Sequence, residues 1–237
     1  MMGIFAVIGV LTVIGLGYWL IIVTEGAYFG AWAVRLIYRF GARHYDDVRD
    51  AIVRDDQTVL LPLLERALSG SYQPQVLDVA TGTGRVPLLL AGAPGFRGRI
   101  VGLDLTPEML HYAQIRQAQL APDAPIAWYL GEAGDLPWPD QSFDLVSCLE
   151  ALEFFPRPRR ALTEMRRVLR PGGTLLISKI PDNWARLLPG RALTKKALIR
   201  EFSRLGFEDS TIMPWQPGHY ELVIVRREPA AAAESVV

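Results

Sequence analysis

The residues best suited to chemistry lie where an apolar segment runs into a glycine turn. The stretch Val76–Pro87 carries Asp78 within a hydrophobic run, and Gly82 and Gly84 follow before a helical pattern begins. Glycines permit a tight turn and a close approach of ligand to backbone, and a helix N-terminus offers free N–H groups to a carboxylate or phosphate. A carboxylate in an apolar strand end needs partners, so we expect Asp78 to face a donor-rich ligand or the amides of the turn.

A second carboxylate is placed to bind a sugar. Asp104 stands 20 residues beyond Gly84, at the end of the next apolar run, where a carboxylate can accept both ribose hydroxyls of a nucleoside. The alternative is that Asp104 caps the helix predicted from Pro107, although Thr106 is the nearer cap. A dinucleotide site would need a third glycine at position 87, and Pro87 therefore disfavours a nucleotide-dependent oxidoreductase.

Alternating strand and helix patterns must position these residues. Short apolar runs separated by helical patterns predict an α/β domain with an open parallel sheet covered on both faces. Helices are clearest over 107–119 and 158–169, the second ending at a turn over Arg170–Gly173. The predicted strands are Val76–Ala80, Arg99–Asp104, Ile126–Leu130, Phe143–Cys148, Thr174–Ser178 and an antiparallel edge pair, Ser210–Met213 and Tyr220–Val225.

Residues 1–24 are predicted to form a transmembrane helix. No charged side chain precedes Glu25, and Ile4–Val23 is almost wholly apolar. At ~1.5 Å per residue, Gly3–Val23 would rise about 31 Å as a helix, against a hydrocarbon core of roughly 30 Å. A cleaved signal peptide and a buried core helix are the alternatives. The apolar run is longer than that of a typical signal peptide, and it lacks the polar face that a core helix usually has.

The side-chain pattern of residues 25–44 predicts an amphipathic helix next to the membrane. Arg35, Arg39 and Arg43 recur every four residues on one face, and aromatic and aliphatic residues occupy the others. Such a helix either lies against lipid headgroups or packs its apolar side on the following domain, and the pattern fits both. Because these arginines follow the span and no basic residue precedes it, we expect a single-pass protein of the cell membrane with its catalytic domain in the cytoplasm.

Composition excludes several classes of partner. Lysine plus arginine and aspartate plus glutamate are each 25, so bulk charge gives no reason to expect nucleic acid as a partner. Cys148 is the single cysteine, which excludes an internal disulfide framework and a multi-thiolate metal cluster. The three histidines, His44, His111 and His219, lack zinc-ligand spacing, so no metal site is expected.

Four segments together resemble class I S-adenosylmethionine-dependent methyltransferases, most nearly the ubiquinone and menaquinone biosynthesis subgroup. Besides the glycine turn they are Gly102–Leu110, Gly131–Asp144 and Arg167–Gly173. The resemblance implies a Rossmann-like, doubly wound, seven-stranded sheet with an antiparallel last strand. The transmembrane helix expected from the composition of residues 1–24 would precede it. The methyltransferase domain would occupy residues 45–228, with a loose tail over 229–237.

The resemblance also implies S-adenosylmethionine as cofactor and a set of contacts to it. The glycine turn would lie under the amino acid part, Asp104 would hold the ribose, and Tyr45 would help to cover the cofactor. Glu132 would reach the adenine edge, although relatives usually have aspartate there. The implied cofactor-binding residues are Tyr45, Asp78, Ala80, Thr81, Gly82, Gly84, Asp104, Leu105, Glu132, Ala133 and Leu149.

No catalytic residue is assigned from the sequence. Phe154 stands where many relatives have a histidine, and methyl transfer from a sulfonium depends on alignment and exclusion of water more than on a base. If the acceptor loses a proton, the candidates are Glu150, Glu153, His44 and His219, each of which could equally be a surface or salt-bridged residue.

The expected membrane anchor indicates the substrate class. A tethered domain is placed to meet a lipid, so we expect the bilayer as a partner and a lipid or quinone-type acceptor. Two alternatives stay open: an inactive membrane scaffold with the same fold, and a methyltransferase that acts on a membrane protein.

Overall fold

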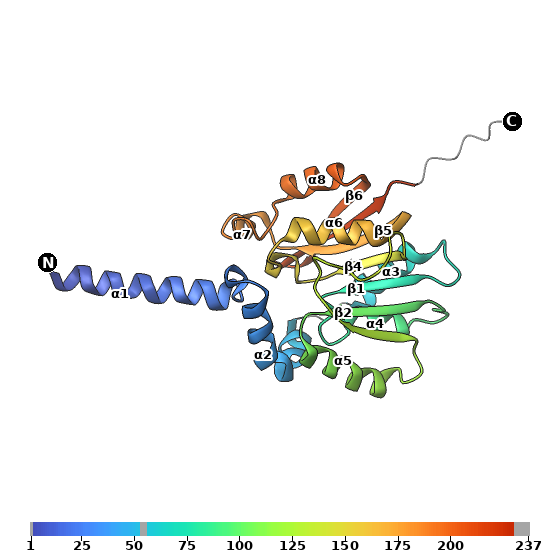
Figure 1. Ribbon diagram of the computed structural model, residues 1–237, viewed down its shortest axis with the longest axis horizontal. Coiled ribbons are helices and arrows are strands. Elements are labelled where there is room, and N and C mark those ends of the chain that lie inside the picture. Colours follow the sequence, from blue (N-terminus) through green and yellow to red (C-terminus); the bar gives the residue numbers. More distant parts are fainter. Residues whose placement is uncertain (1, 53–55, 230–237) are drawn as a thin grey trace.

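A seven-stranded mixed sheet forms the centre of the domain, and a long helix projects from one end (Figure 1). The computed structural model describes the backbone of residues 2–52 and 56–229, and the side chains of residues 4–42 and 56–229. The strand order is β3-β2-β1-β4-β5-β7-β6. The strands are β1 (Gln75–Val79), β2 (Arg99–Asp104), β3 (Ile126–Leu130), β4 (Phe143–Cys148), β5 (Leu169–Lys179), β6 (Phe207–Gln216) and β7 (Tyr220–Arg227).

The topology confirms the predicted Rossmann-like α/β fold. Strands β1 to β5 run parallel, and β7 runs antiparallel to both of its neighbours, β5 and β6. The central strand β1 is buried from Val76 to Val79, because helices cover both faces of the sheet. This burial explains why the strand appears in the sequence as a continuous apolar run interrupted only by Asp78.

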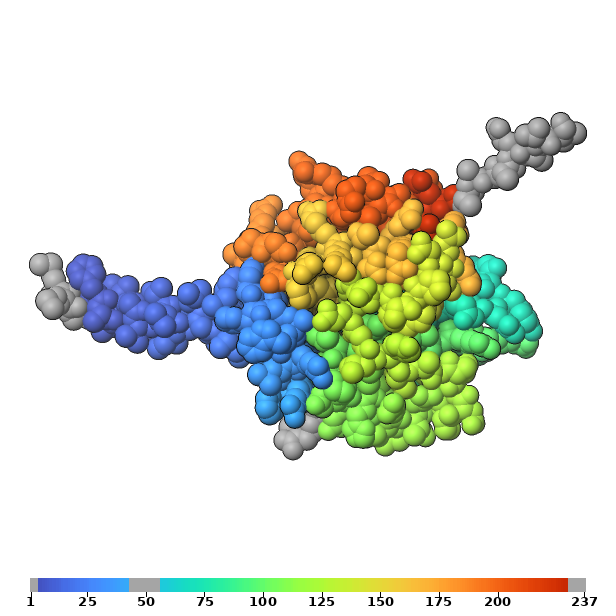
Figure 2. All heavy atoms as spheres, viewed as in Figure 1, coloured from blue at the N-terminus to red at the C-terminus, as the bar shows by residue number. Residues whose placement is uncertain are grey.

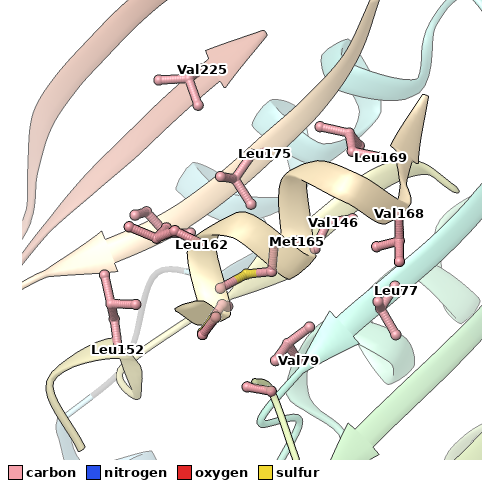
Figure 3. Close-up of a cluster of buried hydrophobic side chains, with 14 of the residues drawn as sticks. Leu77, Val79, Val146, Leu152, Leu162, Met165, Val168, Leu169, Leu175 and Val225 are labelled. Atoms are coloured by element: carbon pink, nitrogen blue, oxygen red, sulfur yellow. The ribbon is translucent and has the colours of Figure 1, made fainter. Parts of the chain in front are cut away.

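Helices cover the two faces of the sheet. On one face, Leu162 and Met165 of α6 pack against Leu77, Val146 and Leu175 of the strands (Figure 3). On the other, α3 and α4 pack against a second buried cluster. The helices of the domain are α3 (Leu61–Leu68), α4 (Arg85–Ala91), α5 (Pro107–Leu120), α6 (Pro158–Val168), α7 (Asp182–Ala185) and α8 (Lys195–Arg204), with a short 3-10 turn at Leu152–Phe154.

One predicted turn is part of a strand. The sequence predicts that Arg170–Gly173 separates helix from strand, but this segment lies inside β5. Leu169 already pairs with Phe143, and the register to β4 then shifts before pairing resumes at Thr174. The segment bulges out of the ladder, which glycine allows because Gly172 has a φ of +76°.

The apolar N-terminal segment is helical and stands clear of the domain. Helix α1 (Met2–Tyr18) continues into a π-helical turn over Trp19–Val23. Within the part of the chain that the structure describes, Ile4–Val23 is the one helix long and apolar enough to cross a membrane, and the rest of the protein buries none of it. Figure 2 shows it as a separate rod attached to the domain at one end.

Helix α2 (Ala31–Ile52) connects this rod to the domain. It begins after a 3-10 turn at Ala27–Phe29, and it continues past residue 44, the predicted end of the amphipathic segment. Ala33 is buried, and Arg39 forms an ion pair with Glu108 of α5 at 3.2 Å. Helix α2 therefore packs on the domain, which is one of the two arrangements that its pattern allows.

Candidate functional site

A cavity of about 450 Å³ lies at the carboxyl ends of the parallel strands. Its floor is formed by residues that follow β1, β2, β3 and β4, at the point where the strand order reverses between β1 and β4. The inner face of α2 contributes a wall through Ala31, Val34 and Tyr38, and Phe154 and Phe155 contribute another. Open α/β sheets bind ligands at this edge, so the cavity is the candidate site.

The turn after β1 has a backbone that only small residues adopt easily. Gly82 and Gly84 have φ values of +55° and +85°, and Ala80 reaches +56°. Gly84 is the N-cap of α4, and a Cβ there would lie 2.6 Å from the ring of Trp128. Gly82 lines the cavity without a side chain. The strand, turn and helix predicted for 76–87 are confirmed. At this turn the backbone of Gly82 is exposed to the cavity without a side chain in between.

Asp104 joins the turn to the end of β2. It is 8% exposed and lines the cavity; its Oδ2 accepts from the Gly82 N–H at 2.8 Å and its Oδ1 from the Thr106 N–H at 2.9 Å. Burial raises the pKa of Asp104, and these hydrogen bonds oppose the rise. The Thr106 hydroxyl and the Leu105 N–H also hydrogen-bond this carboxylate, so a ligand hydroxyl would share it with these donors.

The cap predicted for helix α5 is wrong in its detail. Thr106 is the N-cap residue, but its side chain makes no capping bond to the helix. Its hydroxyl bonds Asp104, and Asp104 in turn accepts from its backbone N–H. The carboxylate therefore draws both polar groups of Thr106 to itself, and it fixes the start of α5 relative to the glycine turn.

Asp78 has different partners from those expected. The hydroxyls of Thr81 and Ser147 donate to its two carboxylate oxygens at 2.7 and 2.6 Å. Burial raises the pKa of Asp78 to about 6, against the effect of these bonds and of Arg85. Hydroxyls of the turn and of β4 thus bond this carboxylate, where backbone amides of the turn are one of the two expected partners, and a contact to a ligand stays a prediction. It borders a small recess beside the main cavity.

The predicted cofactor residues divide between the cavity and its surroundings. Those that line the cavity are Ala80, Gly82, Asp104, Leu105, Glu132, Ala133 and Leu149. Thr81 borders the small recess together with Asp78, and Gly84 starts the adjoining helix α4. The side chains of Tyr45 and of the candidate base His44 lie outside the described residues.

Arg85 is a site residue that the sequence did not reveal. Its guanidinium pairs with Asp56 and Glu150, each at 2.5 Å, and lies over the ring of Trp215 at 4.7 Å. Although burial acts to lower it, the pKa of Arg85 is raised by these carboxylates. Glu150 also accepts from Gln216 at 2.6 Å. These partners lie far along the chain, so no local pattern could have identified the cluster.

A buried carboxyl group, Glu153, lies next to the residues of the loop after β4 that line the cavity. The Tyr220 hydroxyl donates to Glu153 Oε1 at 2.6 Å, and burial raises the pKa of Glu153 to about 7. The negative charge of Glu25, in the turn between the apolar rod and α2, also raises the pKa values of Glu153 and Tyr220. Burial raises the pKa of Glu25 itself, and a hydrogen bond from Tyr38 opposes this.

The remaining candidates do not join the cavity. His219 is exposed in the turn between β6 and β7. Cys148 is buried, and burial raises the pKa of its thiol well above the ordinary value. Among the described residues, no group of three or more histidines, cysteines or acidic residues is placed to hold a metal ion.

Comparison with known proteins shows which family this domain resembles. Residues 77–177 match the family model described as the methyltransferase domain, and the match spans the glycine turn, Asp104 and the loop after β4. This segment of the chain is thus similar to a methyltransferase domain. Solved structures share its fold: a 4+2 cyclase, SpnF, has a TM-score of 0.68 at 18% identity and covers 85% of this chain and 97% of its own.

A second structural neighbour is described as an S-adenosylmethionine-dependent methyltransferase. This protein, from Methanococcus maripaludis, has a TM-score of 0.64 at 15% identity and covers 82% of this chain and 95% of its own. At such low identity, both neighbours establish the fold of the methyltransferase domain alone. The reaction has to be argued from the site, since one fold supports many chemistries.

The curated relatives are named as quinone methyltransferases. A 2-phytyl-1,4-naphtoquinone methyltransferase of Synechococcus elongatus is 35% identical over 114 residues, which are 48% of this chain and 49% of the relative. A demethylmenaquinone methyltransferase of Deinococcus radiodurans is 44% identical over 108 residues, 45% of this chain and 43% of the relative. The chain thus spans about half the length of the curated relatives that it matches.

The cavity fits the cofactor of class I methyltransferase domains, S-adenosylmethionine. Its volume lies in the range of small-molecule sites, roughly 300–1,000 Å³. At the turn, Gly82 leaves room for a ligand against the backbone, and Asp104 is a buried carboxylate that lines the cavity, where sugar hydroxyls could donate to it. Leu105 and Ala133 add apolar surface suited to a purine ring.

Proposed function

We propose that the protein is a membrane-anchored methyltransferase that transfers the methyl group of S-adenosylmethionine to a quinone-type or other lipid acceptor at the cytoplasmic face of the cell membrane. The observation that carries the proposal is the hydrogen bond from the Gly82 N–H to Asp104. This bond connects the glycine turn after β1 to the buried carboxylate at the end of β2. The amino acid part and the ribose of one S-adenosylmethionine molecule would therefore contact two groups that are held at a fixed distance from each other.

In this proposal the strand ends bind the cofactor. Asp104 accepts the ribose hydroxyls, Leu105 and Ala133 contact the adenine, and Glu132 accepts from its exocyclic amine. Ala80, Gly82 and Leu149 surround the amino acid part. Asp78, Thr81 and Gly84 act through the turn, which they hold in shape, and Tyr45 would close over the cofactor from α2.

The acceptor then occupies the part of the cavity under α2. There the walls are Ala31, Val34 and Tyr38 on the helix and Phe154 and Phe155 on the loop after β4. This wall is apolar apart from the Tyr38 hydroxyl, as a quinone-type ring or another lipid would require. The names of the relatives support the same acceptor class, because those proteins are described as acting on naphthoquinones and demethylmenaquinone.

The chain's own residues would align the acceptor and exclude water. The cofactor supplies a methyl group on a sulfonium, which is already an activated leaving group. Glu150 lines the cavity, and its Oε1 accepts from both Arg85 and Gln216. We therefore assign the rate enhancement to positioning in a closed apolar site and assign no general base.

The segment between the rod and the domain is packed in the structure. This packing supports a membrane anchor that is kept in the mature protein. Thr24 and Ala27 are buried, and the ring of Tyr28 stacks on Trp19 in the last turn of the rod at 5.2 Å between centroids. The Tyr28 hydroxyl also donates to the Pro189 carbonyl at 2.9 Å. This junction is packed against the domain, as expected for a segment that stays in the folded protein. Arg35 and Arg39 after the rod support a cytoplasmic domain.

The experiment is to incubate the full-length protein in native lipid vesicles with methyl-labelled S-adenosylmethionine and to extract the lipids. We expect label in the lipid fraction and, within it, in a quinone-type molecule. Label confined to water-soluble products would contradict the acceptor class, and label in protein would favour a membrane-protein acceptor. Cofactor binding without any transfer would indicate an inactive scaffold.

A further inference from the structure

Helix α2 has one face that lines the cavity and an opposite face that is exposed on the surface. Ala31, Val34 and Tyr38 point into the cavity. Trp32, one residue on from the first of these, is 66% exposed. Residues four apart lie on the same side of a helix, so the outward side continues from Trp32 through Leu36 and Phe40. The wall of the cavity and a row of exposed large apolar side chains are therefore opposite sides of one helix.

A second group of exposed apolar residues lies at the same end of the molecule. Trp184 of α7 is 48% exposed and Leu187, just after it, is 56% exposed. Figure 1 shows α7 and α2 at the end of the domain from which α1 projects. We call these residues the apolar rim; its members are Phe29, Trp32, Leu36, Phe40, Trp184 and Leu187.

Specific contacts tie the two parts of the rim to each other and to the cavity. The guanidinium of Arg191, which follows α7, lies over the Tyr28 ring at 5.1 Å and donates to the Phe155 carbonyl at 3.1 Å. Tyr28 also bonds the Pro189 carbonyl. The turn after the rod, the α7 segment and the loop that lines the cavity thus form one connected unit.

The position of the rim relative to the rod limits its possible occupants. Only eight residues separate Val23, where the rod ends, from Trp32, and the stacking of Tyr28 on Trp19 holds this stretch against the rod. A rod that crosses the bilayer would therefore leave the rim at the bilayer surface. Tryptophan and phenylalanine with neighbouring arginines are the side chains favoured at that depth, and Arg35 and Arg186 are exposed beside the rim.

We propose that the apolar rim is a second membrane-binding surface, which lies in the boundary between headgroups and acyl chains and holds the cavity against the bilayer. The proposal rests on the anchoring role proposed above for the rod, and it adds a consequence. An acceptor dissolved in the bilayer reaches the cavity past α2 without crossing water. The occupant of the rim is thus the lipid bilayer itself.

The test uses the full-length protein in vesicles of phosphatidylcholine with a minor share of phosphatidylglycerol. Cys148 is fully buried, so a cysteine introduced elsewhere can be labelled selectively with an environment-sensitive fluorophore. Trp32→Cys and Trp184→Cys place the label on the rim. Leu120→Cys is the control, because Leu120 is as exposed as Trp32, at 66%, but ends α5 at the opposite edge of the sheet.

We expect the labels at positions 32 and 184 to shift to the blue in vesicles and to be quenched several-fold more strongly by lipid-borne quenchers than the label at position 120. If the protein floats with the vesicles but the rim labels show the same emission and quenching as the control label, the rim does not bind the membrane. The proposed anchor would then still stand. An intermolecular disulfide formed by the unlabelled Trp32→Cys or Trp184→Cys protein under oxidising conditions would assign this surface to a dimer and also overturn it. Protein that does not float would overturn the anchor and the rim together.

Discussion

Glu153 is a buried carboxyl group that titrates near neutral pH. Its pKa rises from 4.5 to about 7, chiefly through burial, while its hydrogen bond from Tyr220 opposes the rise. Because the folded state holds this proton more tightly than the unfolded state, the contribution of Glu153 to stability is greatest below about pH 4.5 and is lost as the pH rises through about 7. Asp78, with its pKa raised to about 6, acts in the same direction.

Replacement of Glu153 by glutamine should remove most of its contribution to this pH dependence. Glutamine can still accept from the Tyr220 hydroxyl through its amide oxygen, so the packing is kept. A rise of about 2.5 pKa units corresponds to about 3 kcal/mol across this window. Chemical unfolding of wild type and Glu153→Gln at several pH values measures the difference. Parallel curves for the two proteins would show that the carboxyl group does not titrate in this range.

The carboxylates of the site are predictable from the sequence, but their partners are not. Asp104 and the glycine turn are recognisable because strand, turn and helix signals adjoin them. The hydroxyl of Ser147 and the guanidinium of Arg85 reach the site only through the pairing of β1 with β4 and the packing of distant segments. No pattern along the chain encodes such contacts, and hence the hydroxyl partners of Asp78 could not be predicted.

Among the secondary-structure elements, helix α4 can begin where it does because position 84 is glycine. Gly84→Ala should destabilise the fold for two reasons. A left-handed residue with a Cβ costs roughly 1–2 kcal/mol, and overlap with Trp128, whose ring would lie 2.6 Å from the Cβ, adds about 1–3 kcal/mol. Gly95→Ala is the matched control, since Gly95 has a φ of +79° and open space around it.

Denaturant unfolding compares the two variants. We expect Gly84→Ala to lose clearly more stability than Gly95→Ala and to bind S-adenosylmethionine less tightly. Equal losses would mean that only backbone strain matters at this turn and that Trp128 moves aside freely.

Helix α2 gives a second prediction for a single element. Val34→Trp should fill the cavity from the inner face of α2. Turnover of the acceptor should fall tenfold or more, which corresponds to a loss of acceptor binding energy on the order of 1.4 kcal/mol. The dissociation constant for S-adenosylmethionine should change little, because the cofactor is proposed to bind at the strand ends. Leu36→Trp adds a similar bulk on the outer, exposed side. Equal turnover in the two variants would contradict the placement of the acceptor under α2.

The elements themselves are largely predictable. The bounds of β2, β3 and β4 agree with those expected, because turn residues flank each apolar run. Strand β5 begins earlier than predicted, since the glycines of Arg170–Gly173 look like a turn until pairing with β4 draws them into the ladder. The course of α2 over the cavity is not predictable, as its pattern fits lipid and protein surroundings equally well.

For the protein as a whole, the rod and the domain should be separable. The domain buries none of Ile4–Val23, so deletion of residues 1–23 should leave cofactor affinity unchanged. Turnover of an acceptor carried in vesicles should fall about a hundredfold or more, because the tether raises the local concentration of acceptor. Turnover of a short-chain, water-soluble analogue is the control. An equal fall with both acceptors would indicate that the rod supports the fold.

Titration of S-adenosylmethionine into wild type and Asp104→Asn is the decisive test of the proposed cofactor site. Asparagine cannot accept from both the Gly82 and the Thr106 N–H groups and still bind ribose, and a lost bond to a charged group costs about 1.5–3 kcal/mol. Calorimetry should therefore show tight binding to wild type and a dissociation constant about 10- to 100-fold higher for Asp104→Asn. Asp140→Asn, on an exposed carboxylate paired with Arg167 outside the cavity, should bind as wild type does. A folded Asp104→Asn protein with wild-type affinity, or wild type that takes up no cofactor, would contradict the proposed site.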